Sequence, residues 1–388
     1  MKKSLDRIPF NRPCFLGNEL EYISRAVSSG QISGDGFFSH KCHEFMEKKF
    51  NAKKVLLTTS CTHALELASL LLNLKEEDEV IVPSYTFVST VNAFMLRGAK
   101  PVFVDIRDDT KNIDENLIEE KITKKTKAIF PVHYAGVACN MEKIMEIAES
   151  HNLYVVEDAA QGVGAKHKKD YLGTIGSFGC YSFHETKNFI CGEGGALVIN
   201  DEQFIERAEI LREKGTNRSK FFRGEIDKYT WVDIGSSYLP SEILAAFLFA
   251  QLEIMDKITN LRKQIFERYY ETFKNLREGF GIELPVIPNY CLPNYHMFYL
   301  LLRSEDERNS LIRRLEEKNI ASVFHYVPLH LSPVGLRLGY KKGDLPVTED
   351  ISKRLVRLPF YNDLKEDEQD YVIQEVKTCL KDSLLLKR

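Results

Sequence analysis

The stretch Ser182-Phe-His-Glu-Thr-Lys-Asn188, with Gly192-Glu-Gly-Gly195 shortly after it, places a lysine, Lys187, between an expected strand and a glycine-rich turn. Upstream, Tyr154-Val-Val-Glu-Asp-Ala-Ala-Gln161 has the pattern of an apolar strand that ends in an acid, Asp158. Pyridoxal phosphate (PLP) needs a lysine to hold its aldehyde and a carboxylate to keep its ring nitrogen protonated. The two segments together predict a PLP site.

Around this centre, short apolar runs alternate with helical patterns. Strands that are apolar on both faces and separated by helices indicate an α/β fold, a mainly parallel sheet covered by helices on both sides. Ligands of such sheets bind at the carboxyl ends of the strands. The expected strands span residues 54–58, 79–83, 101–105, 128–132, 153–157, 180–183 and 196–200.

The chain changes character in its last third. A long helical pattern runs from Ser241 to Phe273, with a proline and a serine at its start. Prolines then interrupt the chain, and we expect a strand and two helices at residues 296–302, 305–318 and 365–381. We predict a large PLP-binding domain over residues 1–275, which includes an N-terminal arm and the long linking helix, and a smaller C-terminal α+β domain over residues 276–388.

Composition excludes several classes of protein. The chain has 388 residues, 44% hydrophobic and 28% charged, which is ordinary for a soluble globular protein. A net charge of −3 gives no electrostatic signature of nucleic-acid binding. No apolar run reaches the roughly 18 residues of a membrane helix, and no apolar segment follows the charged N-terminus. The eight cysteines form no C-x-x-C pair, so we expect reduced thiols in a cytoplasmic protein.

The two central residues each have a simpler alternative role. Asp158 follows an apolar strand, so its carboxylate is partly desolvated and needs a cationic partner, such as a protonated pyridine nitrogen. It could instead cap a helix, since Ala-Ala-Gln follows. Lys187 could lie on the surface, but the flanking strand and glycine turn favour a buried amine that is partly neutral.

Three further segments are candidates for contacts to the cofactor. Thr58-Thr-Ser-Cys-Thr-His-Ala-Leu65 joins a strand to a helix, where hydroxyls and free amides can bind a phosphate. A plain capping turn is the alternative. Ser182 could add a hydroxyl to the same phosphate. Phe87 begins the next helix and either stacks on the cofactor ring or packs in the core.

The segment His325-Tyr-Val-Pro-Leu-His330 holds two histidines and a tyrosine in a loop that a proline interrupts. No acid completes a metal ligand set, so we interpret His325, Tyr326 and His330 as polar contacts to a substrate, with a packed loop as the alternative. His184-Glu185 begins like the zinc motif H-E-x-x-H, but Asn188 stands at the second histidine position. We therefore predict no metal.

Together these segments resemble the DegT-type sugar aminotransferases, which are fold-type-I PLP enzymes. The resemblance runs from the Ile8-Pro-Phe10 region to Leu358-Pro-Phe360, nearly the whole chain. It rests on Ile32-Ser-Gly34, Ser60-Cys-Thr-His-Ala-Leu65, Pro83-Ser-Tyr-Thr-Phe-Val-Ser-Thr90, Glu157-Asp-Ala-Ala-Gln161, Ser182-Phe-His-Glu-Thr-Lys-Asn188, Gly192-Glu-Gly-Gly195 and His325-Tyr-Val-Pro-Leu-His330.

The resemblance implies a role for each matching residue. Lys187 matches the lysine that bonds covalently to the cofactor, and Asp158 matches the partner of the pyridine nitrogen. Gln161 matches the residue beside the ring and its 3-hydroxyl, and Phe87 the aromatic on the ring face. The phosphate contacts match Thr62, His63 and Ser182.

The resemblance also implies a homodimer with shared active sites. Gly235-Ser-Ser-Tyr-Leu-Pro-Ser-Glu242 matches the segment that reaches the partner's phosphate, and Ser237 stands where the family usually has Asn. The implied reaction moves an amino group from L-glutamate to a dTDP-linked keto sugar, with ping-pong kinetics. No arginine in the sequence marks itself as the anchor of the donor carboxylate.

The sequence leaves three other functional hypotheses open. A sugar dehydratase of the same family would carry His at the position of Lys187. A non-catalytic binding or regulatory protein of the same fold would not require both Lys187 and Asp158. A nicotinamide-dependent oxidoreductase would show G-x-G-x-x-G after an early strand, and the sequence has none there.

Overall fold

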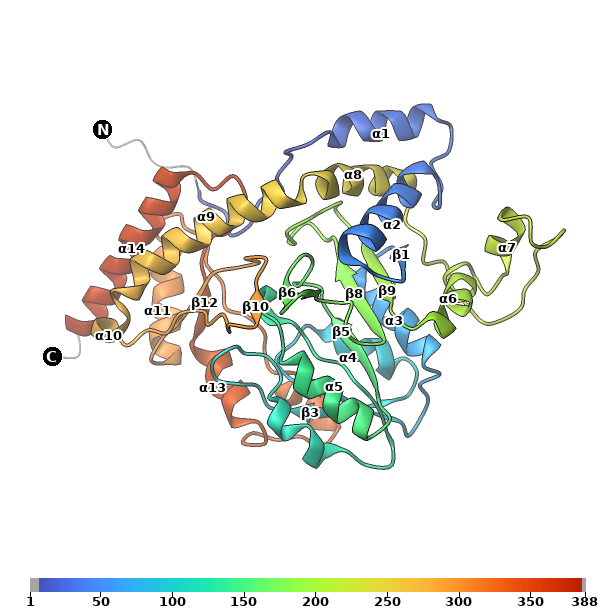
Figure 1. The fold of residues 1–388 in the computed structure, drawn as a ribbon. Helices are drawn as coiled ribbons and strands as arrows, with labels where there is room; N and C mark the ends of the chain where they lie inside the picture. Colours follow the sequence, from blue (N-terminus) through green and yellow to red (C-terminus); the bar gives the residue numbers. More distant parts are fainter. Residues whose placement is uncertain (1–6, 386–388) are drawn as a thin grey trace.

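The computed structural model describes residues 7–385, and the side chains of residues 7–382. Its centre is a seven-stranded sheet surrounded by helices (Figure 1). In spatial order the strands are β1 (Lys54–Thr58), β9 (Gly195–Ile199), β8 (Phe178–Ser182), β5 (Tyr154–Asp158), β4 (Thr126–Ile129), β2 (Glu79–Pro83) and β3 (Lys100–Val104).

The sheet is mainly parallel. β2 pairs in parallel with β3 and β4, β4 with β5, and β5 with β8. Only β9 runs the other way among these strands, antiparallel to both β8 and β1. The predicted α/β fold with a mainly parallel sheet is therefore confirmed, and each of the seven predicted strands forms within a few residues of its expected bounds.

Helices bury both faces of the sheet, as the doubly apolar strands require. One face packs on α3 (Cys61–Leu71), α4 (Val88–Met95) and α6 (Ile205–Arg212). The other face packs on α2 (Phe37–Phe50), α8 (Glu242–Glu253) and α5 (Met141–Ser150). Every residue of β8 and β9 is buried, so the strands beside the predicted lysine lie at the centre of the core.

The predicted single helix from Ser241 to Phe273 is two helices. Ile254, with φ −110° and ψ 20°, leaves the helical region between α8 and α9 (Met255–Lys274). Figure 1 shows α9 continuing from α8 toward the C-terminal part of the molecule. The apolar pattern continues through the break, so periodicity alone gives no sign of it.

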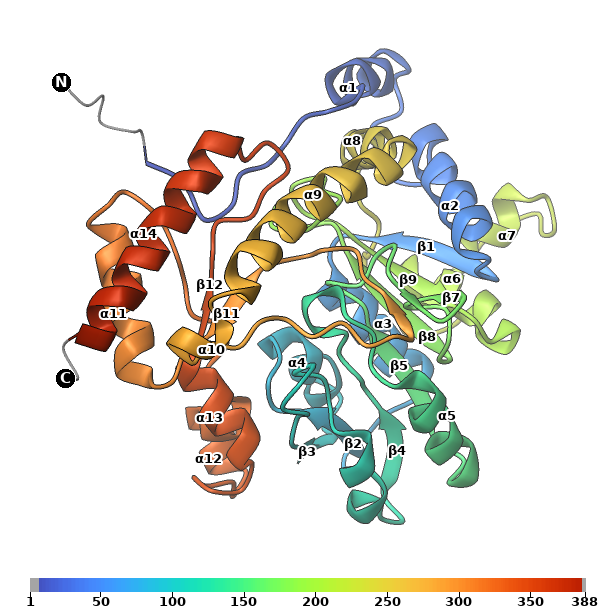
Figure 2. The same ribbon diagram turned by 60° about the vertical axis from the view of Figure 1, so that its left-hand side comes forward.

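A separate apolar core lies in the C-terminal α+β part. β11 (Tyr299–Leu301) and β12 (Leu355–Arg357) pair antiparallel, and α11 (Glu305–Glu316) and α14 (Glu366–Leu385) cover them (Figure 2). The N-terminal arm joins this part through a bridge between Ile8 and Ile320. Since α9 contributes to this core and to the core beneath the sheet, the domain boundary at residue 275 stays a prediction.

Several elements were not expected from the sequence. They include α2, α6 and β12, described above, and also α1 (Glu19–Ser28), α7 (Arg218–Phe222), α10 (Arg277–Phe280), α12 (Pro333–Arg337), α13 (Pro346–Arg354) and a small sheet of β10 (Cys291–Leu292), β6 (Lys166–His167) and β7 (Asp170–Tyr171). The segment around α7 projects from the body of the molecule (Figure 1). Within residues 7–385, no helix combines the length and apolarity needed to cross a bilayer.

Candidate active site

A cavity of about 700 Å³ opens at the carboxyl ends of the parallel strands. This is where a sheet of this type binds its ligands. Side chains that follow five strands line it, together with the N-terminal arm and the C-terminal part. The lining includes Phe10, Asn11, Ser60, Cys61, Thr62, Phe87, Thr90, Val132, Asp158, Gln161, Ser182, Lys187, His296, Phe324, His325, Tyr326 and Arg357.

Lys187 reaches the cavity from the loop between β8 and β9. Its backbone N–H donates to the His184 carbonyl at 2.9 Å, which fixes the turn. Burial is the main reason that its pKa lies below the usual range, and the positive charge of Arg357 acts in the same direction. In the described part of the chain, no side chain bonds to its amine. The amine is therefore free to act as a nucleophile.

Asp158, the last residue of β5, is buried at the floor of the cavity. Oδ2 accepts the Thr90 hydroxyl at 2.7 Å, and Oδ1 accepts the backbone N–H of Ala160 at 3.1 Å. A turn, not a helix, follows it, so the alternative of a helix cap is wrong. Two accepted hydrogen bonds leave lone pairs on the carboxylate for a cationic partner.

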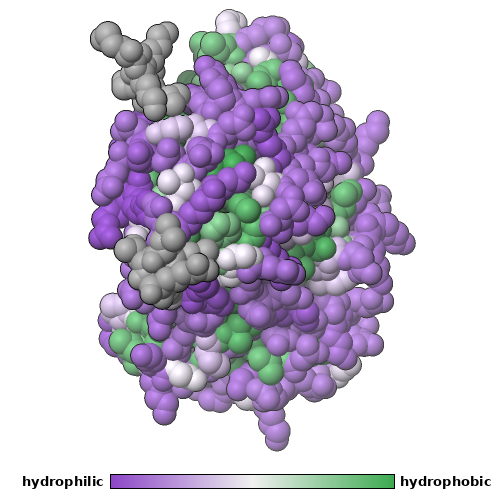
Figure 3. Space-filling model, turned by 90° about the vertical axis from the view of Figure 1, so that its left-hand side faces the viewer, coloured by the Kyte–Doolittle hydropathy of each residue, from purple (hydrophilic) through white to green (hydrophobic). Residues whose placement is uncertain are grey.

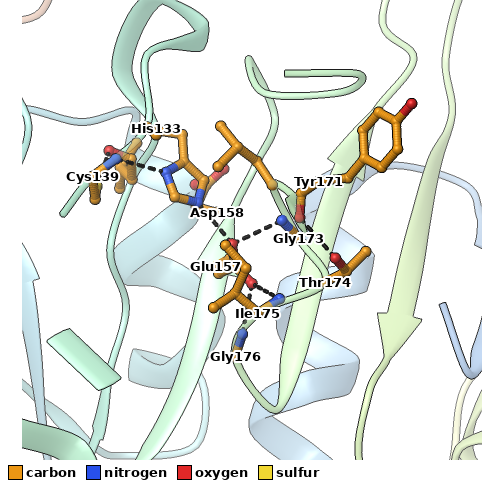
Figure 4. A network of polar contacts seen from close by, with 12 residues as sticks. His133, Cys139, Glu157, Asp158, Tyr171, Gly173, Thr174, Ile175 and Gly176 are labelled. Carbon is orange, nitrogen blue, oxygen red and sulfur yellow. Dashed lines mark hydrogen bonds and ion pairs between the residues drawn. The ribbon is translucent and has the colours of Figure 1, made fainter. Parts of the chain in front are cut away.

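Glu157, the neighbour of Asp158, points into the opposite side of β5 and anchors the strand end (Figure 4). Its carboxylate is fully buried. It accepts hydrogen bonds from His133 Nε2 at 2.9 Å and from the backbone N–H groups of Gly173, Ile175 and Gly176 at 2.8, 2.7 and 2.7 Å. This network holds the peptide from which Asp158 projects.

Gln161 links the turn after β5 to the loop that holds His325 and Tyr326. Its Oε1 accepts from the Ala135 N–H at 2.7 Å, and its Nε2 donates to the Tyr326 hydroxyl at 3.0 Å. The rings of His325 and Tyr326 stack at 3.7 Å, and His325 Nδ1 lies 2.7 Å from the Tyr134 hydroxyl. Burial, with the nearby charge of Arg357, holds the pKa of His325 well below its usual range. His325 is thus a neutral imidazole at pH 7.

The start of α3 forms part of the cavity wall. Ser60 caps the helix by accepting from the His63 N–H at 3.1 Å, and the His63 ring bonds to Thr59 and packs edge-on against Tyr238. The hydroxyls of Thr62 and Ser182 line the cavity, whereas His63 does not. The segment is therefore a capped helix start that also lines the cavity, and its contact to a phosphate stays a prediction.

The glycine turn allows the start of β9 to lie very close to the backbone at the start of α3. A Cβ on Gly195, the first residue of β9, would lie 2.3 Å from the Ser60 carbonyl carbon and 2.4 Å from the Cys61 nitrogen. Only glycine lets β9 run this close to the start of α3. The glycine therefore sets the depth of the α3 N-terminus in the cavity.

The structure gives a separate outcome for each of three other predicted contacts. Phe87 is 58% exposed and lines the cavity, so core packing is wrong for it. His330 is fully buried outside the cavity, with Nδ1 2.7 Å from Ser84 Oγ and Nε2 3.2 Å from Glu349. Both ring nitrogens are used, so the prediction that His330 binds substrate is corrected to a packed loop. Ser237 lies outside the cavity of its own chain, in a bridge with Glu213.

The model of the DegT/DnrJ/EryC1/StrS aminotransferase family matches residues 13–377. This chain belongs to that family. GDP-perosamine synthase of Escherichia coli O157:H7 is 33% identical over 97% of this chain and 99% of its own length. The spore coat polysaccharide biosynthesis protein SpsC of Bacillus subtilis is 31% identical over 96% of this chain and 97% of its own.

Solved structures of aminotransferases are similar to this chain over nearly its whole length. Spr1654 of Streptococcus pneumoniae, proposed to be a sugar aminotransferase, is 28% identical in its PLP form, with a TM-score of 0.90 over 97% of this chain and 99% of that one. Its PMP form gives a TM-score of 0.91 over 98% and 99%. The aminotransferase of Psychrobacter cryohalolentis is 26% identical, with a TM-score of 0.90 over 96% and 99%.

The residues of this DegT-family chain fit PLP. A free amine of lowered pKa, Lys187, and a buried carboxylate with spare lone pairs, Asp158, face one cavity. The Ser182 hydroxyl and the first N–H groups of α3 could supply donors for a phosphate, whereas the Thr62 hydroxyl donates to Ser89 Oγ at 2.8 Å. The chain is an aminotransferase, and its cofactor is PLP.

Sequence reasoning missed the walls of the cavity that come from distant segments. Phe10 and Asn11 belong to the N-terminal arm, and Arg357 ends β12. No spacing links residues 10, 187 and 357, because only the folded chain brings them together. The one available signal for Arg357 was its place directly before Leu358-Pro-Phe360, where the resemblance ended.

Proposed function

We propose that this enzyme transfers the amino group of L-glutamate to C4 of dTDP-4-dehydro-6-deoxy-D-glucose, which gives dTDP-4-amino-4,6-dideoxy-D-galactose. The observation that carries the proposal is the pairing of Lys187 and Asp158 in one cavity of about 700 Å³. That volume lies within the range of pockets that bind whole small-molecule ligands. Mere binding of a sugar nucleotide would not require an amine of lowered pKa and a buried carboxylate in the same cavity.

The residues have the following proposed roles. Bound PLP supplies an electron sink, and Asp158 keeps its ring nitrogen protonated. Lys187 would hold the cofactor at rest, and its neutral amine could then take a proton from the substrate carbon. Its lowered pKa supports this role, because a base must be neutral to accept a proton. Gln161 and Phe87 orient the ring, and Thr62 and Ser182 bind the phosphate.

The substrate contacts proposed are His325 and Tyr326. Their stacked rings and the Gln161–Tyr326 hydrogen bond connect the sugar side of the cavity to the cofactor side. A neutral imidazole and a phenol can each donate to or accept from a sugar hydroxyl without adding charge. This wall therefore suits an uncharged sugar ring.

The choice of sugar rests on a finer resemblance. Ser182-Phe-His-Glu-Thr-Lys-Asn188 and Gly235-Ser-Ser-Tyr-Leu-Pro-Ser-Glu242 resemble dTDP-4-amino-4,6-dideoxygalactose transaminase of enterobacterial common antigen synthesis. We accordingly propose a role in cell-surface polysaccharide biosynthesis. The alternative is another nucleotide-linked keto sugar, and the relative named GDP-perosamine synthase favours a GDP-linked one as the runner-up.

We propose a homodimer in which Ser237 of the partner subunit reaches the phosphate. Large apolar side chains are exposed around α7, with Trp231 at 75% and Phe222 at 68%, and on α1 and α2, with Leu20 at 77% and Phe37 at 56%. By contrast, the face around α11 and α14 is mainly hydrophilic, with small separate apolar groups (Figure 3). The apolar surfaces favour the α7 and α1–α2 side as the dimer contact.

A cytoplasmic location completes the proposal. Nucleotide sugars are substrates of the cell interior, and the eight cysteines are all free thiols, seven of them buried. The thiols are compatible with a reducing compartment.

The test is turnover with named substrates. Purified enzyme with PLP and L-glutamate is offered dTDP-4-dehydro-6-deoxy-D-glucose and, separately, its GDP-linked 4-keto-6-deoxy counterpart, and the amino sugars are identified by mass spectrometry and NMR. The proposal expects at least about tenfold higher kcat/KM for the dTDP sugar. Preference for the GDP sugar would replace it with the runner-up. Cofactor binding without conversion of either sugar would favour a non-catalytic sugar-nucleotide-binding or regulatory protein.

A further inference from the structure

Arg357 is a cation in the cavity wall that has no anionic partner among the described residues. It ends β12 and lines the cavity that holds Lys187. Its Nε is buried and has no hydrogen-bond partner among the described residues. Nor does any carboxylate in residues 7–382 form an ion pair with it. A half-buried guanidinium with a buried, unpaired Nε is costly unless an anion from outside the chain binds it.

Other arginines nearby show that this is exceptional. Arg354, three residues earlier, pairs with Asp350 at 2.6 Å and with Glu283 at 3.5 Å. Arg262, which is buried, donates to the carbonyls of Tyr295 and His296 and to Asn362 Oδ1. Both meet acceptors that the fold itself supplies. Arg357 instead faces the cavity with its donors unused.

The backbone holds Arg357 firmly in place. Its N–H donates to the Val323 carbonyl at 2.8 Å, and Val323 N–H donates back at 3.3 Å. The guanidinium lies over the Phe10 ring, 4.6 Å from the centroid, so the N-terminal arm supports one face of the group. A side chain fixed on both sides can present its fork of N–H groups to a ligand with little loss of entropy.

The charge of Arg357 is felt by the reacting groups. Arg357 and Lys187 line the same cavity. Burial is the main cause of the lowered pKa of Lys187 and of His325, and the positive charge of Arg357 acts in the same direction on both. In an amino acid, the α-carboxylate is bonded to the carbon that carries the amino group. In a sugar nucleotide with a keto group at C4, the diphosphate is attached across the ring at C1. An anion site this near Lys187 therefore matches the carboxylate better than the diphosphate.

We propose that Arg357 binds the α-carboxylate of the amino donor and so forms the donor-specific part of the shared cavity. The proposal rests on the aminotransferase activity with L-glutamate described above and adds a residue that determines the donor. A guanidinium can bind a carboxylate through two parallel N–H···O bonds, which fixes the plane of the donor as well as its position. The sugar in the second half-reaction would use His325 and Tyr326 instead.

The first test measures binding, not turnover. The dissociation constants of glutarate and of dTDP are determined by calorimetry on the PLP holoenzyme of the wild type, Arg357→Gln, Arg357→Lys and the matched control Arg354→Gln. Glutarate carries the carboxylates of the donor but no amino group. Arg357→Gln should weaken the binding of glutarate about 10- to 100-fold, and Arg357→Lys should weaken it less. Arg354→Gln should change it by less than about twofold. The affinity for dTDP should be unchanged in all three variants.

The second test compares donors that differ at one group. L-glutamate and its α-amide are each mixed with the holoenzyme, and the loss of the visible PLP absorbance is followed in a single half-reaction. The wild type should prefer L-glutamate, and Arg357→Gln should reduce that preference about 10-fold or more by slowing the L-glutamate reaction alone. Retained PLP absorbance in each variant shows that the fold and the cofactor site are intact, and Arg357→Lys serves if Arg357→Gln does not fold.

The outcomes separate this inference from the proposed activity. If glutarate affinity is unchanged in Arg357→Gln, or if dTDP affinity falls instead, the carboxylate subsite is overturned even though the enzyme still transaminates. If the wild type binds glutarate but does not react with L-glutamate, and Arg357→Gln binds glutarate more weakly, the proposed activity with this donor fails while the carboxylate site stands.

Discussion

Thr90 in α4 donates its hydroxyl hydrogen to Oδ2 of Asp158 at 2.7 Å, and so joins the helix after β2 to the end of β5. Thr86 Oγ1 lies 2.8 Å from Thr90 Oγ1, which extends the chain of hydroxyls. The Ala160 N–H holds the other carboxylate oxygen at 3.1 Å. The carboxylate is thus oriented before any cofactor arrives, and this pre-organisation should strengthen PLP binding.

Thr90→Val tests the orientation of Asp158. Valine keeps the shape of threonine but removes the donor to a charged acceptor, a bond of about 1.5 to 3 kcal/mol. We expect PLP affinity to fall by about tenfold or more, measured by cofactor titration of the apoenzyme. Thr378→Val, on α14, removes an equivalent hydroxyl far from the cavity and should leave PLP affinity unchanged. Equal affinities in wild type and Thr90→Val would contradict the role of this hydrogen bond.

The buried amine of Lys187 should make the apoenzyme less stable near neutral pH. Burial lowers its pKa in the folded state, so between that value and about 10.5 the unfolded chain binds a proton that the folded chain does not. The free energy of unfolding contributed by this group therefore rises with pH, by up to about 1.4 kcal/mol per pH unit, and levels off above 10.5.

Lys187→Met removes this dependence. In urea unfolding of the PLP-free protein, the variant should be more stable than wild type at pH 7, and its advantage should shrink as the pH rises toward 10. Lys263→Met, at a half-exposed lysine on α9, should show no such trend. A constant difference between Lys187→Met and wild type across this range would mean that the amine is not desolvated.

Glu157→Gln should destabilise the protein through the strand end that carries Asp158. In the wild type, the carboxylate accepts hydrogen bonds from His133 and three backbone N–H groups. Glutamine would place an NH2 group, itself a donor, against some of these donors. We expect a loss of about 2 to 4 kcal/mol in the free energy of unfolding. Glu142→Gln, at an exposed glutamate paired with Lys168, should leave the free energy of unfolding close to that of the wild type. A similar small loss at Glu157 would refute the anchoring role.

Gly195→Ala should damage the cofactor site through backbone displacement. The added Cβ would lie 2.3 Å from the Ser60 carbonyl carbon, so β9 and the start of α3 must separate. We expect loss of soluble protein or at least about tenfold weaker PLP binding, since a strained backbone contact of this kind costs a few kcal/mol. Gly279→Ala meets no atom within 4 Å and should behave as wild type. Wild-type PLP affinity in Gly195→Ala would show that this spacing does not shape the site.

Local patterns were sufficient to predict the sheet and its central pair. A strand that is apolar throughout reveals its burial, and a polar residue at its carboxyl end must face the ligand edge, which is why Asp158 and Lys187 were recognisable. The same rule left Phe87 open between ring stacking and core packing, and the role of Thr62 came only from the resemblance, although both residues line the cavity.

Contacts made by tertiary packing were not accessible in this way. His330 lies in the same loop as His325, yet Glu349 and Ser84 use both of its ring nitrogens, and neither partner is near it in sequence. Arg357 becomes distinctive only because no carboxylate of residues 7–382 pairs with it, and an absent partner cannot be recognised from a local sequence pattern. The break at Ile254 likewise depends on which core each half of the helix meets.

The most direct test of the account is the absorbance spectrum of the protein with PLP, before and after L-glutamate, for wild type and Lys187→Ala. We predict that wild type shows the visible band of lysine-bound cofactor, that L-glutamate converts it to a near-ultraviolet band, and that Lys187→Ala lacks the resting band. Absence of the band in wild type, or its full retention in Lys187→Ala, would contradict the assignment of Lys187 as the cofactor-binding lysine.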